Sequence, residues 1–143
     1  MNERPTVRLP FFVYGTLRPG EINHDRYLRG RIRSEEPARL ADAVLYDGPG
    51  YPYAVVEPDG VVHGELVTAL PEVYDELLPA LDELEECVPG DPRGRYERVA
   101  RQVTLDADGT AVLAWVYIAG PAVAARLRAH GGLIDGGDWR ARR

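Results

Sequence analysis

Glu85 is the carboxylate whose place in the sequence conflicts with the pattern around it. On a helix at about 100° per residue, an apolar face runs through residues 73–88, and most of its acidic residues lie roughly 120° or more from the centre of that face. Glu85 lies only about 60° from the centre. The apolar face holds Val73, Tyr74, Leu77, Leu78, Leu81, Leu84 and Val88, and the opposite face holds Asp75, Glu76, Asp82, Glu83 and Glu86.

A carboxylate on an apolar face costs free energy unless it is paired. Burial also raises its pKa toward the range that suits proton transfer. Glu85 is therefore a candidate general acid/base. The alternative is a carboxylate at the edge of the apolar face that extends into solvent or pairs with an arginine, and periodicity alone leaves both interpretations open.

The second candidate is the joint within "FFVYGTLRPGEINH", where residues 15–20 connect a strand-like apolar run to a polar, helix-like segment. A tight turn needs about two to four residues, so this joint is long. A glycine-bracketed loop of this kind presents backbone N–H groups to a ligand. Phosphate is a common ligand of such loops. The sequence does not support it here, because it has neither a P-loop lysine nor a G-x-G-x-x-G motif.

Two tyrosines stand on predicted strands. In "RYERV", Tyr96 and Arg98 share one strand face, which looks outward or into a barrel mouth if the apolar residues that follow face the core. They could equally be a half-exposed tyrosine beside a solvated arginine. Tyr117, in "WVYIA", lies on a strand that should be central, so its hydroxyl needs a partner. It either caps a core group or reaches into a cavity.

Other chemistries lack support in the sequence. Its three histidines stand apart, without metal-ligand spacing, and the single cysteine, Cys87, cannot form an internal disulfide. A net charge of −6 argues against a nucleic-acid partner held through phosphates. No apolar run reaches the roughly 18 residues of a membrane helix, and "MNERPTVRLP" lacks the apolar centre of a signal peptide. We therefore expect no metal, no nucleic-acid or membrane partner, and a cytoplasmic location.

Strands dominate the elements that must position these residues. The patterns predict strands in 10–16, 38–48, 51–57, 61–70, 95–105 and 110–120, with the last of these central, and helices in 22–30, 71–86 and 121–130. "EPDG" predicts a tight turn that makes a hairpin of the two strands beside it. Pro79 should break or kink its helix and open a second short one. The glycine-rich residues 131–143 are predicted to trail off without regular structure.

This arrangement predicts an α+β fold in a single domain, residues 1–143. Helices gather between the strands rather than alternating with them, which favours a mixed or antiparallel sheet curled into a small barrel.

The chain resembles the gamma-glutamylcyclotransferase-like family, which includes AIG2-like proteins and gamma-glutamylamine cyclotransferases. "VYGTLRPGEINHDRYL" is similar to the strand and loop signature of that family, and "LDELEE" and "YERV" resemble its L-D-x-x-E helix and Y-x-R strand. "VYIA" and, less closely, "IDGGDW" match later positions. The motifs follow in the family order from about residue 10 to 139.

The resemblance implies a small mixed β-barrel flanked by short helices and a cofactor-independent enzyme. Its substrate would be a small gamma-glutamyl compound, whose own α-amine attacks the γ-carbonyl to give 5-oxoproline and release an amine or amino acid. The catalytic acid/base falls on Glu85, and the implied substrate-binding residues are Tyr14, Gly15, Thr16, Leu17, Arg18, Tyr96 and Tyr117. The alternative is a binding or regulatory domain that keeps the family cavity without turnover.

The chain departs from the family pattern beside this glutamate. Many members have glycine directly after it, where this chain has Glu86 and then Cys87. The loop "CVPGDPRGR" that follows is long, and it is expected to border the leaving group.

Overall fold

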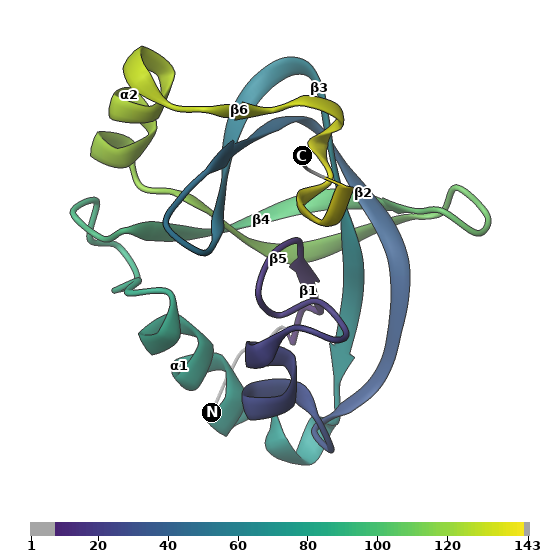
Figure 1. The fold of residues 1–143 in the computed structure, drawn as a ribbon. Coiled ribbons are helices and arrows are strands. Elements are labelled where there is room, and N and C mark those ends of the chain that lie inside the picture. Colours follow the sequence, from purple (N-terminus) through teal and green to yellow (C-terminus); the bar gives the residue numbers. More distant parts are fainter. Residues whose placement is uncertain (1–7, 142–143) are drawn as a thin grey trace, which may run out of the picture.

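Five strands close into a mixed β-barrel in the computed structural model, which describes residues 8–141 (Figure 1). Their order around the barrel is β3-β1-β5-β4-β2, and β2 pairs with β3 to close it. β1 and β5 are parallel, and the other pairs are antiparallel. The strands are β1 (Phe11–Val13), β2 (Ile32–Asp47), β3 (Pro52–Ala69), β4 (Tyr96–Leu105) and β5 (Ala111–Ala119). The predicted α+β fold with a small mixed barrel and a central β5 is confirmed.

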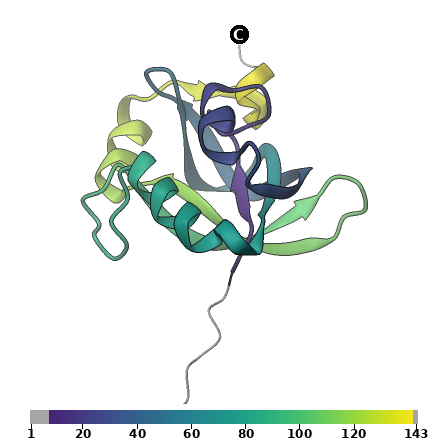
Figure 2. The same cartoon turned by 90° about the horizontal axis from the view of Figure 1, so that it is seen from below.

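Short helices surround the barrel (Figure 2). They are a π-helical turn (His24–Leu28), a 3₁₀ turn (Pro71–Val73), α1 (Tyr74–Leu84) and α2 (Pro121–His130). None of the helices in residues 8–141 is long and apolar enough to cross a membrane.

The strands alternate their side chains between two apolar clusters. One cluster draws on all five barrel strands and fills the barrel interior, with Phe12, Leu45, Val62, Val103 and Val116 almost fully buried. The other lies on the outer barrel surface, where Phe11, Val67 and Tyr96 pack against Leu77 and Leu81 of α1. This alternation is the two-residue period of a strand, and it leaves the end of α1 close to the barrel wall.

The predicted hairpin at "EPDG" is wrong. β3 continues through these residues as one strand, because β2 is long enough to pair with both halves: Ala41 lies opposite Val61, and Ala43 opposite Val56. The intervening residues bulge against Asp42, whose side chain accepts a hydrogen bond from the Asp59 N–H at 3.2 Å. The local turn chemistry is present, since Asp59 has a φ of 68°, but it produces a bulge instead of a reversal.

Two further predictions are corrected. Pro79 does not open a second helix, because α1 runs continuously from Tyr74 to Leu84 with Pro79 on its exposed side. The C-terminal residues do not trail off. They form β6 (Leu133–Ile134), which pairs with β2, and 3₁₀ turns at Asp135–Gly137 and Trp139–Ala141, and the Trp139 side chain packs into the interior cluster.

Candidate active site

The C-terminal turn of α1 fixes the position of Glu85. The Cys87 N–H donates to the Asp82 carbonyl at 2.8 Å, and the Glu86 N–H donates to the Glu83 carbonyl at 3.1 Å. These two bonds form a Schellman motif, in which Glu85 is the C-cap directly after the last residue of α1 and the chain then turns away. The glutamate backbone is therefore held by the helix end and not by a free loop.

This motif gives a physical reason for the glycine that the resembled family pattern has directly after the position of Glu85. Glu86 occupies the left-handed position of the motif, with a φ of 50°. Glycine adopts this conformation without steric cost, and other residues are strained there. The chain turns outward after Leu84, so Val88 is 62% exposed and does not extend the apolar face as the helical pattern predicts.

Opposite Glu85 lies the loop that follows β1. Gly15 is required there, because a Cβ at this position would lie 2.7 Å from Cδ of Pro52. Thr16 is held from behind, since its Oγ1 accepts a hydrogen bond from Asn23 Nδ2 at 2.8 Å. Within residues 8–141, the N–H groups of Gly15, Thr16 and Leu17 donate to no other group, which leaves them available to a ligand.

Arg18 is the one predicted site residue that does not line the cavity. Its guanidinium is buried and donates to both carboxylate oxygens of Glu65, at 2.8 and 3.0 Å, and to Asp138 at 2.8 Å. Arg18 therefore anchors the loop to β3 and to the C-terminal segment, and the predicted substrate contact is not supported by this geometry.

Three tyrosines frame the cavity, and all three hydroxyls already have partners. Tyr14 donates to the backbone carbonyl of Tyr117 and accepts from the Ala54 N–H. Tyr96 donates to the carbonyl of Pro52 at 2.7 Å, across the cavity. Tyr117 donates to Asp82 at 2.7 Å. Both possibilities raised for Tyr117 hold, because its hydroxyl caps a buried group while the side chain lines the cavity.

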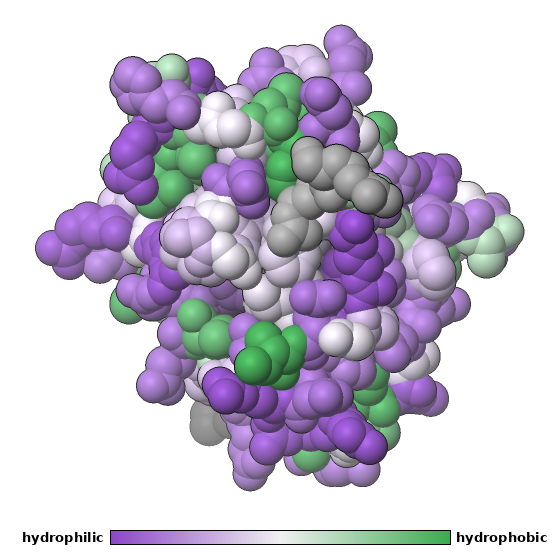
Figure 3. Space-filling view, viewed as in Figure 1, coloured by the Kyte–Doolittle hydropathy of each residue, from purple (hydrophilic) through white to green (hydrophobic). Residues whose placement is uncertain are grey.

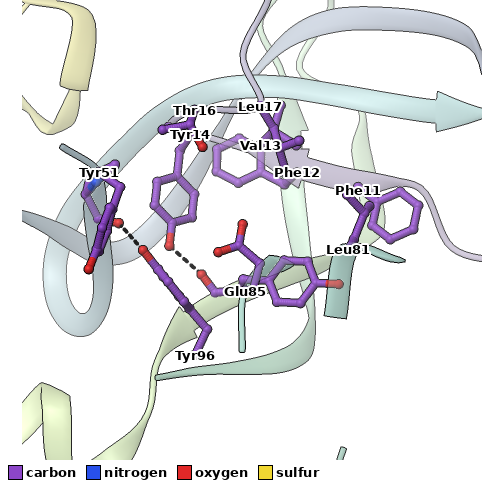
Figure 4. A pocket seen from close by; sticks show the side chains of 13 residues that line it. Phe11, Phe12, Val13, Tyr14, Thr16, Leu17, Tyr51, Leu81, Glu85 and Tyr96 are labelled. Carbon is purple, nitrogen blue, oxygen red and sulfur yellow. Dashed lines mark hydrogen bonds between the residues drawn. The ribbon is translucent and has the colours of Figure 1, made fainter. Parts of the chain in front are cut away.

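These elements enclose one cavity of about 460 Å³ of empty space, part of it open to solvent. Eight site residues were predicted, and all except Arg18 line this cavity. Figure 4 shows the Glu85 carboxylate pointing into the cavity toward Tyr14. Those seven are Tyr14, Gly15, Thr16, Leu17, Glu85, Tyr96 and Tyr117.

Electrostatics allow Glu85 to gain and lose a proton near neutral pH. Burial raises the pKa of this carboxyl to about 7, although the nearby positive charge of Arg95 lowers it in part. Within the described residues, the Glu85 carboxylate takes part in no hydrogen bond or salt bridge, so burial is not offset by a partner. Burial, together with the charge of Glu85, keeps the pKa of Tyr14 far above its ordinary value.

The most important residue that the helical pattern misplaced is Asp82, which it puts on the exposed face. Asp82 is buried and accepts hydrogen bonds from Arg98 Nε at 2.8 Å and from the Tyr117 hydroxyl. Arg98 also lies over the Trp115 ring, at 4.3 Å from its centroid. Tyr51 and Pro52 were missed as well. They line the cavity where the chain enters β3, in a segment that the sequence pattern predicts only as a strand.

The arrangement suits acid/base chemistry on a small polar molecule. A carboxyl group with a pKa near 7 can both accept and donate protons at neutral pH, and free amides opposite it can hold a carboxylate or a developing oxyanion. Among residues 8–141, no cluster of three or more histidine, cysteine or acidic side chains could hold a metal ion.

Comparisons with known proteins relate the chain to one family. Residues 11–141 match the family described as gamma-glutamyl cyclotransferase, AIG2-like. The chain is 39% identical over 108 residues to a gamma-L-glutamyl-butirosin B gamma-glutamyl cyclotransferase from Niallia circulans, which is 75% of this chain but only 64% of that relative. It is 36% identical to a putative gamma-glutamylcyclotransferase from Vibrio cholerae, with 90% of this chain and 92% of the relative covered.

A solved structure extends the comparison to the fold. The crystal structure of a mouse AIG2-like protein superposes with a TM-score of 0.58 at 25% identity and covers 77% of this chain and 76% of its own. The barrel, the loop after β1 and the glutamate at the end of α1 thus occur in a chain that matches the family over nearly its whole length. The chain belongs to the gamma-glutamyl cyclotransferase, AIG2-like family.

Proposed function

We propose that this protein is a gamma-glutamyl cyclotransferase in which Glu85 is the general acid/base. The observation that carries the proposal is the partly buried Glu85 carboxylate, which has no hydrogen-bonding or ionic partner among residues 8–141 and shares one cavity with the free amides of the loop after β1. Family membership supports the reaction class, and the cavity geometry supports the assignment of residues.

The reaction would proceed within one substrate molecule. The α-nitrogen of the gamma-glutamyl group attacks its own γ-carbonyl carbon, a C–N bond forms, and the five-membered ring of 5-oxoproline closes as the bond to the leaving nitrogen breaks. The α-ammonium loses two protons and the leaving nitrogen gains two. A single carboxylate that carries protons from one nitrogen to the other therefore ends the cycle unchanged.

The remaining residues would bind and orient the substrate. The amides of Gly15, Thr16 and Leu17 are placed to hold the α-carboxylate or the developing oxyanion, an effect often worth about 10²–10³-fold in rate. Tyr14, Tyr96 and Tyr117 shape the walls, since their hydroxyls are already bonded to protein groups. Amine and carbonyl belong to the same molecule, so holding it folded supplies much of the acceleration.

The name of the Niallia relative gives its substrate as gamma-L-glutamyl-butirosin B. For the present chain we infer a small-molecule gamma-glutamyl substrate, and the test therefore varies the leaving group.

The test incubates the protein with gamma-glutamyl amines and gamma-glutamyl dipeptides and follows 5-oxoproline by mass spectrometry. We expect turnover of at least one class, and a loss of about 10²–10⁴-fold in kcat for Glu85→Gln. Glu83→Gln is the matched control, because Glu83 lies exposed on the same helix. Full activity in Glu85→Gln would contradict the mechanism. Binding of the substrates without any 5-oxoproline would favour a domain that binds gamma-glutamyl compounds and does not convert them.

A further inference from the structure

Arg95 does not itself line the cavity, but it lies against a residue that does, and its charge acts on the proposed acid/base. Its guanidinium stands over the ring of Tyr51, at 4.9 Å from the ring centroid, and Tyr51 lines the cavity. The same guanidinium forms a salt bridge with Glu86, the neighbour of Glu85 in the chain. The Arg95 N–H donates to the Glu86 carbonyl at 3.2 Å, which brings the end of the long loop 87–95 back to the end of α1.

Arg95 is the charged group that acts on Glu85. The groups that face this carboxyl from β1, β4 and β5 are the hydroxyls of Tyr14, Tyr96 and Tyr117, whose pKa values are raised, so they stay neutral over the physiological range. The positive charge of Arg95 lowers the pKa of Glu85 against the larger effect of burial. A second charge that enters the cavity mouth would therefore meet Arg95 first.

The present partner of Arg95 can be replaced. The side chain of Glu86 is 61% exposed, and that of Arg95 is 29% exposed. Ion pairs with so exposed a partner contribute little to stability, typically about 0–1 kcal/mol, so a substrate carboxylate can compete for the guanidinium. An arginine offers a planar pair of N–H donors that matches a carboxylate, and its stacking on Tyr51 holds that plane in place.

We propose that Arg95 is a specificity-determining residue that favours substrates whose leaving group carries a carboxylate beside the scissile nitrogen. This inference rests on the proposed function. With the glutamyl part held at the loop after β1 and the leaving nitrogen near Glu85, the rest of the leaving group points to the mouth beside Tyr51, against which Arg95 lies. Leaving groups that are amino acids are then preferred over neutral or cationic amines.

The experiment compares two substrates that differ only in this charge, gamma-L-glutamyl-L-alanine and gamma-L-glutamyl-L-alaninamide. In the wild-type protein, kcat/KM for the carboxylate substrate should exceed that for the amide by about tenfold, as one charge-assisted hydrogen bond allows. Arg95→Gln should reduce the ratio to near one, chiefly by slowing the carboxylate substrate. Equal rates in the wild-type protein, or an unchanged ratio in Arg95→Gln, would overturn the proposal.

The control is Arg93→Gln. Arg93 belongs to the same loop, but its side chain is 88% exposed and is paired with Asp91, so the ratio should not change.

A second readout is the pH dependence of kcat/KM, whose acidic limb is expected near pH 7 in the wild-type protein. Loss of the Arg95 charge raises the pKa of Glu85, so the limb should move to higher pH in Arg95→Gln and stay in place in Arg93→Gln. A role of Arg95 in folding alone would not move this limb.

Binding separates this inference from the proposed function. Titration calorimetry of the same two dipeptides into Glu85→Gln measures leaving-group recognition without chemistry. A preference for gamma-L-glutamyl-L-alanine that disappears in Glu85→Gln/Arg95→Gln supports the role of Arg95 even if the wild-type protein converts neither compound. Equal dissociation constants in Glu85→Gln contradict it even if the wild-type protein converts both.

Discussion

Glu85 combines partial burial with the lack of any hydrogen-bonding partner among the described residues, and this combination has a cost. Ordinary buried carboxylates are paired, because an unpaired charge in a poorly solvated site destabilises the folded state. Here the cost appears as a pKa of about 7 instead of 4.5. At pH values where the Glu85 carboxyl ionises, the folded protein should therefore be less stable than a variant with a neutral side chain at this position. At lower pH the two should be equally stable.

The stability of Glu85→Gln should therefore depend on pH relative to the wild-type protein. Below about pH 4.5, Glu85 is protonated in both the folded and unfolded states and costs nothing. As the pH rises to 7, the unfolded state loses its proton first, and the folded state becomes relatively less stable by about 2–3 kcal/mol. Urea unfolding at pH 4 and pH 8 should show that Glu85→Gln gains stability over the wild type only at pH 8. Glu83→Gln should show no such difference, and a flat result for Glu85→Gln would exclude this cost.

At the level of elements, the end of α1 is clamped to the barrel by one polar cluster. Asp82 lies one helical turn before Glu85 and binds Arg98 on β4 and Tyr117 on β5. The two charged side chains are only 12% and 13% exposed, so the pair is largely shielded from water. This cluster ties the helix end to β4 and β5 one turn before Glu85, in addition to the apolar packing of Leu77 and Leu81.

Asp82→Ala should accordingly be costly. Removing one partner of a buried ion pair leaves the Arg98 charge uncompensated, and such changes cost about 3–5 kcal/mol. Asp75→Ala, on the same helix, breaks a pair with Arg8 in which the side chains are 73% and 44% exposed, and it should cost no more than about 1 kcal/mol. Chemical denaturation of the two variants measures the difference. Similar losses in both would mean that the Asp82 pair does not anchor the helix.

The whole molecule is tied together by its C-terminal segment. Arg18, in the loop after β1, is held by Glu65 of β3 and by Asp138, so two parts of the chain far apart in sequence support the same loop. Next to Asp138, the Trp139 side chain is 5% exposed and packs into the interior cluster of the barrel. The face of the molecule in Figure 3 is mostly hydrophilic, with apolar side chains in small separate groups.

Trp139→Ala tests the importance of this segment. Truncating a large buried aromatic side chain typically costs about 3–5 kcal/mol, through lost transfer energy and the cavity left behind. Leu113→Ala is the control, because Leu113 is 46% exposed on β5 and should cost less than about 1 kcal/mol. Thermal and urea unfolding should rank the two variants in this order. A small effect of Trp139→Ala would show that the barrel is complete without the C-terminal turn.

The sequence determined more of the candidate site than of its supports. Helical periodicity singled out Glu85, and the glycine-bracketed joint after β1 indicated an amide-presenting loop, because both signals depend on residues close together in the chain. The strand pattern predicted a mixed or antiparallel sheet curled into a small barrel, and the family resemblance implied the mixed form. Local turn chemistry failed at "EPDG", where pairing with the long β2 decided the outcome, and at Pro79, where the helix runs on without a break.

Only the tertiary structure decided which polar residues face the site and which support it. Asp82 looked exposed because a helical pattern does not show that Arg98 and Tyr117 lie opposite, and Arg18 looked available because its partners are 47 and 120 residues away. Arg95 reaches Tyr51 because the long loop returns to the helix end. These placements are long-range pairings of charges and hydroxyls, and their energy depends on distance and burial, which no local pattern of residues records.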